Sequence, residues 1–260
     1  ERLNGIQEVG GSIPPGSTIF SPVAQAGRRR DRPHPFLRTA PRPISGPMTA
    51  PAFPALTEPQ AIQATIALAR LAGRYGWVPG TAGNFSARID LARAAITASG
   101  GQKGEVDESG VIVADIAANL DGPVQPRLSA EGPLHLQLYR DDPAIGAIAH
   151  AHPLSAVVLS RRHLAAGRIV FEGWEMQKAV TGVTTHEGAI ELPVFANDQD
   201  TKRLGLRVSE AMKGWKRPCF GYLIAGHGIY AWGRDAFEAR KHLEAYAHLL
   251  DLVLEEERRA

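Results

Sequence analysis

Two histidines at the end of a short apolar segment are the first residues that could do chemistry. His150 and His152 stand two positions apart, at the close of the segment that runs from Ile145 to Ala151. In a β-strand this spacing places both imidazoles on the same face. Neutral imidazole is a good ligand for zinc, and a rigid strand supplies two such ligands at low entropic cost. By itself, however, the spacing also fits a pair of hydrogen-bonded histidines at a strand end.

A metal site needs a third ligand, and His227 is the best candidate. It lies between Gly226 and Gly228, and flanking glycines let the backbone approach a ligand closely. Three histidines with one open position are typical of a catalytic zinc site rather than a structural one. His186 is an alternative ligand, although a structural or surface role fits it better.

Two loops of small residues could bind an oxyanion. Residues 83–86 contain Asn84 and Ser86, and residues 97–101 contain Thr97, Ser99 and Gly100. Such loops combine side-chain donors with exposed backbone N–H groups, and Lys103 could add a positive charge. The same residue types also dominate ordinary turns, so the loops alone do not establish a binding site.

Two carboxylates, Glu131 and Glu175, stand near the predicted ends of helices. Glu131 follows Ser129 at the start of one helix, and Glu175 lies between a strand and a helix. A negative charge near a helix N-terminus is stabilising without any catalytic role. A role in catalysis requires each carboxylate to reach the metal site, which spacing does not decide.

The elements that must position these residues alternate irregularly between strands and helices. Apolar patterns predict strands and helices in the following segments: strands at 96–99, 111–113, 145–151, 169–171, 190–195, 222–225 and 229–232, and helices from Thr57, over 130–140, around 204–212 and over 235–258. Residues 76–86, rich in glycine, are expected to form a tight loop. Several strand pairs are too close in sequence for helical crossovers. We therefore expect an α/β fold with a mixed, largely antiparallel sheet covered by helices.

Composition excludes several classes of protein. The chain has 260 residues, 44% of them hydrophobic and 22% charged, with a formal net charge of +2. This balance argues against a nucleic-acid or membrane-surface protein, and no apolar run approaches the ~20 residues of a membrane helix. The single cysteine, Cys219, excludes an internal disulfide and a cysteine-based zinc site. A reducing compartment, the cytoplasm, is therefore expected.

The first 47 residues differ from the rest in composition. They hold eight of the 19 prolines and seven arginines against three acidic residues, and they show no apolar periodicity. Such a segment cannot bury enough surface to offset its ordering entropy. We expect residues 1–47 to be a disordered extension and residues 48–260 to be the catalytic domain. A basic arm that binds nucleic acid is a less favoured alternative.

In combination, these motifs resemble the class II aldolase/adducin family over about residues 58–255. The resemblance rests on an ordered series of short motifs: Gly-Asn-Phe-Ser at 83–86, Thr-Ala-Ser-Gly at 97–100, Ser-Ala-Glu at 129–131, His-Ala-His at 150–152 and Gly-His-Gly at 226–228. Further segments, at 175–178, 197–200 and 228–234, look like the methylthioribulose-1-phosphate dehydratase branch of this family.

The resemblance implies a three-layer α/β/α subunit with one zinc ion, in a homo-oligomer for which a tetramer is favoured. The family's metal ligands match His150, His152 and His227. Its phosphate-binding positions match Asn84, Ser86, Thr97, Ser99 and Gly100, with Ser129 nearby. Glu131 matches a catalytic base or metal neighbour of the sugar-phosphate aldolases, and Glu175 matches the acid/base proposed for the dehydratase branch. Because some members carry cysteine near the Glu131 position, the role of Glu131 is less secure.

The activity implied is zinc-dependent dehydration of 5-methylthioribulose 1-phosphate to 2,3-diketo-5-methylthiopentyl 1-phosphate, a step of methionine salvage. An aldolase or epimerase acting on another sugar phosphate would use the same metal and loops. An adducin-like interaction module without catalysis is a third possibility. The three histidines argue against the module, because a binding module has no need of metal ligands.

Overall fold

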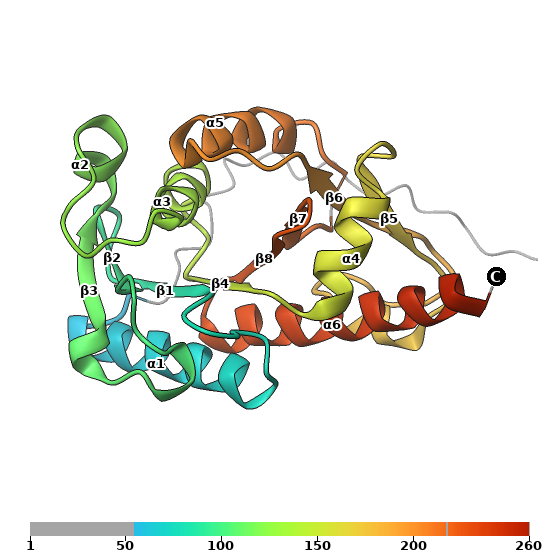
Figure 1. Ribbon diagram of the computed structural model, residues 1–260, viewed down its shortest axis with the longest axis horizontal. Coiled ribbons are helices and arrows are strands. Elements are labelled where there is room, and N and C mark those ends of the chain that lie inside the picture. The colour runs from blue at the N-terminus through green and yellow to red at the C-terminus, as the bar shows by residue number, and fades with distance from the viewer. Residues whose placement is uncertain (1–54, 217, 260) are drawn as a thin grey trace, which may run out of the picture. The chain divides into compact units, whose positions relative to one another are not determined.

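The computed structural model describes residues 55–216 and 218–259 (Figure 1). The predicted disordered extension, residues 1–47, lies outside the described residues. The boundary at residue 48 therefore stays a prediction. Within the described ranges, no helix is both long enough and apolar enough to span a bilayer.

Six α-helices and eight β-strands make up the described part of the chain. The helices are α1 (Glu58–Arg74), α2 (Ile116–Asp121), α3 (Gly132–Asp141), α4 (Leu154–Arg162), α5 (Thr201–Met212) and α6 (Ala236–Arg259). The strands are β1 (Asn84–Arg88), β2 (Arg93–Thr97), β3 (Val111–Asp115), β4 (Ala147–Ala151), β5 (Arg168–Phe171), β6 (Ile190–Phe195), β7 (Gly221–Ile224) and β8 (Gly228–Gly233). Three short 3₁₀ helices, η1 (Lys103–Glu105), η2 (Glu108–Gly110) and η3 (Glu175–Ala179), complete these elements.

The strands form one sheet in the order β3-β2-β1-β4-β8-β7-β6-β5. Neighbouring strands are antiparallel except β6 and β7, which run parallel. The sheet is therefore mixed and largely antiparallel, as predicted. Strand β4, which carries His150 and ends one residue before His152, lies between β1 and β8 near the middle of the sheet, where both of its edges are hydrogen-bonded.

Helices cover both faces of the sheet, which confirms the three-layer α/β/α architecture. In Figure 1, α3 and α5 lie above the sheet and α1 and α6 lie below it. Alternate residues of each strand enter the two cores: Ala147, Ala149 and Ala151 of β4 pack with the α1 and α6 layer, whereas Ile148 packs with α3 and α5. His150 therefore faces the α3 and α5 layer.

Helix ends agree with local sequence signals. Thr57 caps α1 in a capping box, in which its side chain accepts from the backbone of Gln60 and the Gln60 side chain accepts from the Thr57 backbone. Asp200 caps α5 by accepting from the backbone N–H of Arg203. Threonine and aspartate are both residue types preferred at the N-cap.

The predicted loop at residues 76–86 is partly wrong, because Asn84 to Arg88 form strand β1. All five residues of this strand are buried. Three of them are polar, and they face α3, where Ser86 and Arg88 bond to groups of that helix and of the loop after it. A strand is usually recognised by apolar residues at alternate positions. Because the buried residues facing α3 are polar here, the sequence pattern did not indicate β1. Helices α2 and α4 were not predicted either.

Candidate metal centre

His150 occupies a fixed position in the middle of the sheet. Its ring is fully buried and stacks on Tyr230, with ring centroids 4.0 Å apart and an interplanar angle of 13°. Its Nδ1 lies 2.9 Å from the carbonyl oxygen of Ile229. A carbonyl only accepts, so Nδ1 carries the proton. Burial lowers the pKa of His150 well below 6.5, so the ring is neutral and its Nε2 presents a bare lone pair.

The other two histidines bring their Nε2 atoms to the same point. His152 Nε2 lies 3.0 Å from His150 Nε2, and His227 Nε2 lies 3.3 Å from it. A carboxylate of Glu131 completes the group, with Oε1 2.7 Å from His227 Nε2 and Oε2 3.6 Å from His150 Nε2. All four ligand atoms lie within 4.8 Å of one another.

This donor set fits a divalent metal ion. Nitrogens at the corners of a tetrahedron with metal–nitrogen bonds of ~2.0–2.1 Å are separated by about 3.3 Å, close to the separations seen here. Burial is also the main cause that lowers the pKa of His152, to about 4, so His152 is neutral at pH 7 and can offer its lone pair. The Nδ1–H···O bond from His150 to a backbone carbonyl is the outer-shell contact that fixes the tautomer of a metal ligand. The structure thus brings together the three histidines that the sequence indicated.

Glu131 reaches the cluster from the start of α3. It is the N-cap residue of that helix, but its side chain makes no capping bond and is directed instead to the histidines. Burial raises its pKa, but the hydrogen bond from His227, together with the attraction that the neighbouring imidazoles exert when protonated, outweighs burial and lowers the pKa to about 2. Glu131 is therefore ionised at neutral pH, the form that can bind a metal or accept a proton.

Three of the predicted phosphate-binding residues lie beside this cluster. Asn84 is the β1 partner of His150 and donates through Nδ2 to Ser129 Oγ at 2.9 Å. Ser129 Oγ also accepts from the backbone N–H of Glu131. Lys103 is buried and donates through Nζ to the carbonyls of Thr81 and Gly101, and its pKa is lowered by burial, against the opposing charge of Glu131. These side chains form one wall of polar groups next to the histidines.

Two of the predicted phosphate ligands, Ser86 and Thr97, have hydroxyls that are already hydrogen-bonded within the core. Ser86 is fully buried and bonds to His135 Nδ1 and to Tyr139 Oη, both at 2.8 Å. Thr97 is also fully buried, and its Oγ1 accepts from the backbone N–H of Phe85. The arrangement argues for structural roles of both hydroxyls.

Ser99 and Gly100 form an exposed turn after β2, as the sequence indicated. Ser99 donates its backbone N–H to the carbonyl of Arg127, and Gly100 has a positive φ of 82°. Glycine adopts this left-handed conformation without strain. Their surfaces stay accessible to a ligand.

Glu175 lies outside the cluster. Its side chain is 66% exposed and pairs with Lys178 Nζ at 2.5 Å and with His186 Nδ1 at 3.0 Å. The segment that carries it, η3, packs with the α6 layer, on the opposite side of the sheet from the face that His150 occupies. His186 also lies outside the cluster, in contact with this exposed carboxylate. Within one chain, neither residue joins the metal centre.

Tyr230 was missed by the sequence reasoning, although it is in stacking contact with His150. It follows His227 by three residues, and the pairing of β4 with β8 sets it directly opposite His150. Alternation along β8 places Tyr230 on the face shared with His150, so the pattern would have located it if the β4–β8 pairing had been known.

Comparison with known proteins places this site in a family. Residues 63–254 match the model of the class II aldolase and adducin N-terminal domain. The crystal structure of L-fuculose-1-phosphate aldolase from Thermus thermophilus is 27% identical, covers 75% of this chain and 95% of its own, and superposes with a TM-score of 0.60. YgbL from Klebsiella pneumoniae, titled a putative aldolase/epimerase/decarboxylase, shares the fold with a TM-score of 0.63 at 21% identity, over 79% of this chain and 94% of its own. The chain belongs to the class II aldolase and adducin family.

Curated relatives narrow the similarity to one branch. A methylthioribulose-1-phosphate dehydratase from Parvibaculum lavamentivorans is 52% identical over 204 residues, which cover 78% of this chain and 98% of the relative. The enzyme of the same name from Sorangium cellulosum is 46% identical over 189 residues, or 73% of this chain and 89% of the relative. These values confirm the branch that the sequence motifs indicated.

Proposed function

We propose that this protein is a metal-dependent dehydratase that converts 5-methylthioribulose 1-phosphate to 2,3-diketo-5-methylthiopentyl 1-phosphate in methionine salvage. The observation that carries the proposal is the convergence of three histidine Nε2 atoms and the Glu131 carboxylate, in a chain 52% identical to an enzyme of that name. With one cysteine in the chain, we place the enzyme in a reducing compartment, the cytoplasm.

Zinc is the metal we assign to the cluster, one ion per chain. Three imidazoles suit zinc, and a fourth position left to substrate or water is typical of its catalytic sites. When bound, zinc acts as a Lewis acid that withdraws electron density from the substrate's C2 carbonyl, which makes the C3 proton more acidic. His150, His152 and His227 are the residues that would hold it.

Glu131 is the base that the geometry favours for the C3 proton. Its carboxylate is ionised and lies 2.7 Å from His227 Nε2, so it borders the space in which the reacting carbons would sit. When the C3–H bond breaks, its electrons form a C2–C3 double bond and the C2–O π electrons move to the carbonyl oxygen. These electrons then return to re-form the C2 carbonyl, while the C2–C3 π electrons form a C3–C4 double bond and the C4–O bond breaks. The C4 hydroxyl leaves as water with a proton from a general acid. The C3 enol that remains takes up a proton at C4 and loses its hydroxyl proton, which gives the second ketone.

The substrate phosphate would bind at the polar wall beside the cluster. Asn84, Ser129 and the turn at Ser99 and Gly100 supply uncharged donors, and Lys103 supplies a positive charge within the same wall. Because Lys103 already donates to two carbonyls, we assign it the role of fixing the loop and adding charge, rather than contacting the phosphate alone.

Glu175 is proposed as the second acid/base group, supplied by a neighbouring copy of the chain. Its exposure and its position on the α6 side of the sheet prevent it from serving the metal centre of its own chain. A homo-oligomer, for which we favour a tetramer, would bring an exposed carboxylate of one copy to the site of another.

An aldolase is the second candidate, because of the similarity to L-fuculose-1-phosphate aldolase. The same cluster could stabilise the charge that develops when a carbon–carbon bond breaks. The two activities differ in product: dehydration releases one water and keeps the carbon chain intact, whereas retro-aldol cleavage yields two fragments.

Mass spectrometry of the reaction separates these functions. The purified protein is incubated with 5-methylthioribulose 1-phosphate, with and without a chelator, and zinc is then added back. We expect loss of one water, suppressed by the chelator, restored by zinc and absent in His150→Ala. Detection of two carbon fragments would instead identify the protein as an aldolase. No reaction by zinc-loaded protein would refute the substrate.

A further inference from the structure

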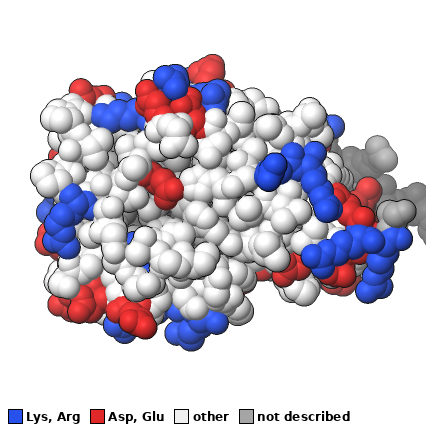
Figure 2. All heavy atoms as spheres, viewed as in Figure 1, with Lys and Arg blue, Asp and Glu red and all other residues white. Residues whose placement is uncertain are grey.

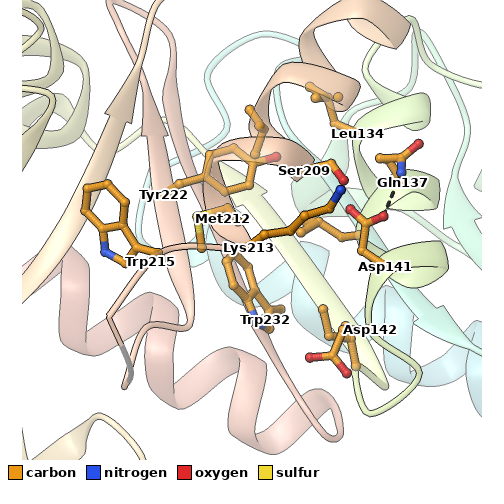
Figure 3. Close-up of a pocket in the computed structure, with 14 residues that line it drawn as sticks. Leu134, Gln137, Asp141, Asp142, Ser209, Met212, Lys213, Trp215, Tyr222 and Trp232 are labelled. Carbon is orange, nitrogen blue, oxygen red and sulfur yellow. Dashed lines mark hydrogen bonds between the residues drawn. The ribbon is translucent and has the colours of Figure 1, made fainter.

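A second cavity lies between α3 and α5, above the strands β7 and β8 (Figure 3). Its volume is about 410 Å³, within the ~300–1,000 Å³ typical of small-molecule sites. Helix α3 and the turn after it form one wall, α5 and the segment after it form the other, and Tyr222 and Trp232 of the sheet form the floor. None of the residues that line it belongs to the metal centre.

A stack of rings separates this cavity from the metal centre. Tyr222 stacks on Tyr230 with centroids 4.9 Å apart, and Tyr230 stacks on His150 at 4.0 Å. The Tyr230 ring therefore lies between the cavity floor and the histidine cluster. The cavity is a separate compartment and not an extension of the substrate site.

Apolar and aromatic side chains supply somewhat more than half of the cavity wall. Trp232, Met212, Leu138 and Ile145 present hydrocarbon or aromatic surface to it. Such a wall favours a ligand with an apolar body, because binding removes apolar surface of both partners from water. Aromatic faces also attract cations.

One polar group in the floor has no partner. Tyr222 is fully buried, and its hydroxyl makes no hydrogen bond within the described part of the chain. Figure 3 shows the hydroxyl directed toward the side on which Leu134 and Ser209 lie. A buried hydroxyl without a partner is destabilising, because it has lost its hydrogen bonds to water. A ligand that hydrogen-bonds to Tyr222 would offset this loss.

The charged groups around the cavity favour a cationic ligand. Asp141 and Asp142 line it, and the only bond of the Asp141 carboxylate given by the described residues comes from the neutral Gln137, at 2.7 Å. The cation of the lining, Lys213, is 2.6 Å from Glu210 and is also close enough to Asp141 for that carboxylate to help raise the pKa of Lys213, so three carboxylates surround one ammonium group. The carboxylates therefore leave an excess of negative charge at the cavity.

We propose that this cavity is a second ligand site, which binds a small amine with an apolar body. The apolar part lies against Trp232 and Met212, and the ammonium group donates to Asp141 and to the Tyr222 hydroxyl. This assignment is independent of the proposed function, because it uses none of the residues of the metal centre.

Three probes of similar shape and different charge test the proposal on the full-length, zinc-loaded protein. They are 2-phenylethylamine, 2-phenylethanol and 3-phenylpropanoate, with binding measured by calorimetry and by ligand-observed NMR. We expect the amine to bind at least about tenfold more tightly than the alcohol, as a charge-assisted hydrogen bond predicts. The carboxylate probe should bind least. Equal binding of all three probes would overturn the proposal. Absence of binding would also overturn it, and is the result expected if a second copy of the chain fills the cavity.

Variants locate the binding. Ser209→Phe places a ring in the cavity and should abolish binding of the amine, whereas Ser209→Ala, which leaves the space open, should retain it. Asp141→Asn keeps the shape of the wall and should remove the preference for the amine over the alcohol. Asp251→Asn, which makes the same change at an exposed residue of α6 outside the lining, is the matched control. Thermal melting and zinc content identify any variant that fails to fold. Undiminished binding to a folded Ser209→Phe protein would refute this location.

Discussion

At the scale of single residues, the chemistry depends on which atoms meet at one point. The three histidines each present Nε2, and Glu131 presents a carboxylate that no helix cap requires. An N-cap carboxylate normally accepts a hydrogen bond from a backbone N–H group of the first helical turn. When the side chain points elsewhere, as that of Glu131 does, another interaction has replaced this bond. That interaction is with the histidine cluster, and it supports Glu131 as the base of the proposed reaction.

Replacing Glu131 by glutamine should separate catalysis from metal binding. Glu131→Gln keeps the size of the side chain but removes the proton acceptor, so kcat should fall by about 10²–10⁴-fold. The zinc content, measured by atomic absorption, should stay near one ion per chain because the three imidazoles remain. His150→Ala, the control, should lose both zinc and activity. A Glu131→Gln protein without zinc would show that Glu131 is a metal ligand first.

The sequence identified the histidines more reliably than the phosphate-binding residues, for a physical reason. His150 and His152 are related by strand alternation, a local rule that does not depend on the rest of the fold. Whether a hydroxyl faces a ligand or the core depends on which elements pack against it. Ser86 faces His135 and Tyr139 of α3, and no feature of its own segment indicated that neighbour.

At the scale of elements, the close approach of β4 and β8 sets the histidine geometry. Gly228 begins β8 directly after His227, and a Cβ built at this position would lie 2.4 Å from the carbonyl oxygen of Ala151 and 3.3 Å from His150 Cε1. Only glycine permits this approach. The pairing of β4 with β8, and with it the distance between His150 and His227, therefore depends on glycine at position 228.

Gly228→Ala should weaken metal binding without touching a ligand. The added methyl group must push β8 away from β4, and small-to-large changes of this kind cost about 1–3 kcal/mol. Displacing the Ile229 carbonyl from His150 Nδ1 should weaken zinc binding by about 10–100-fold, measured by competition with a chromogenic chelator. Gly188→Ala is the matched control, because a Cβ there meets nothing within 4 Å. Equal zinc affinity of both variants would contradict this role for Gly228.

The elements that sequence patterns predicted are those with an apolar face. Helix α6 and strands β6, β7 and β8 were found because their buried residues are hydrophobic. Strand β1 was not, because Asn84, Ser86 and Arg88 are buried with polar partners supplied by distant segments. These residues are buried because distant segments supply hydrogen-bond partners, so the sequence of β1 does not show the alternation of apolar and polar residues that predicts a strand.

At the scale of the whole molecule, one face of the described part is poor in charge. Figure 2 shows this face, viewed as in Figure 1, with Lys, Arg, Asp and Glu gathered at its margins and few of them over its centre. Depletion of charge is a feature of the centres of protein interfaces. This observation favours the proposed homo-oligomer, in which Glu175 of one copy would serve the metal centre of another.

Mixed oligomers test whether Glu175 acts between copies. Glu175→Gln and Glu131→Gln proteins should each be inactive, and each should keep zinc. When the two are co-expressed, some sites combine an intact Glu131 with an intact Glu175 from the neighbour, and statistical mixing predicts about a quarter of the wild-type rate in a symmetric ring. Purification through two different affinity tags ensures that only mixed oligomers are assayed. Recovery would be possible only if the two carboxylates of one site come from different chains. Absence of recovery in a verified mixture would exclude action between copies, and an active Glu175→Gln protein would remove Glu175 from the mechanism.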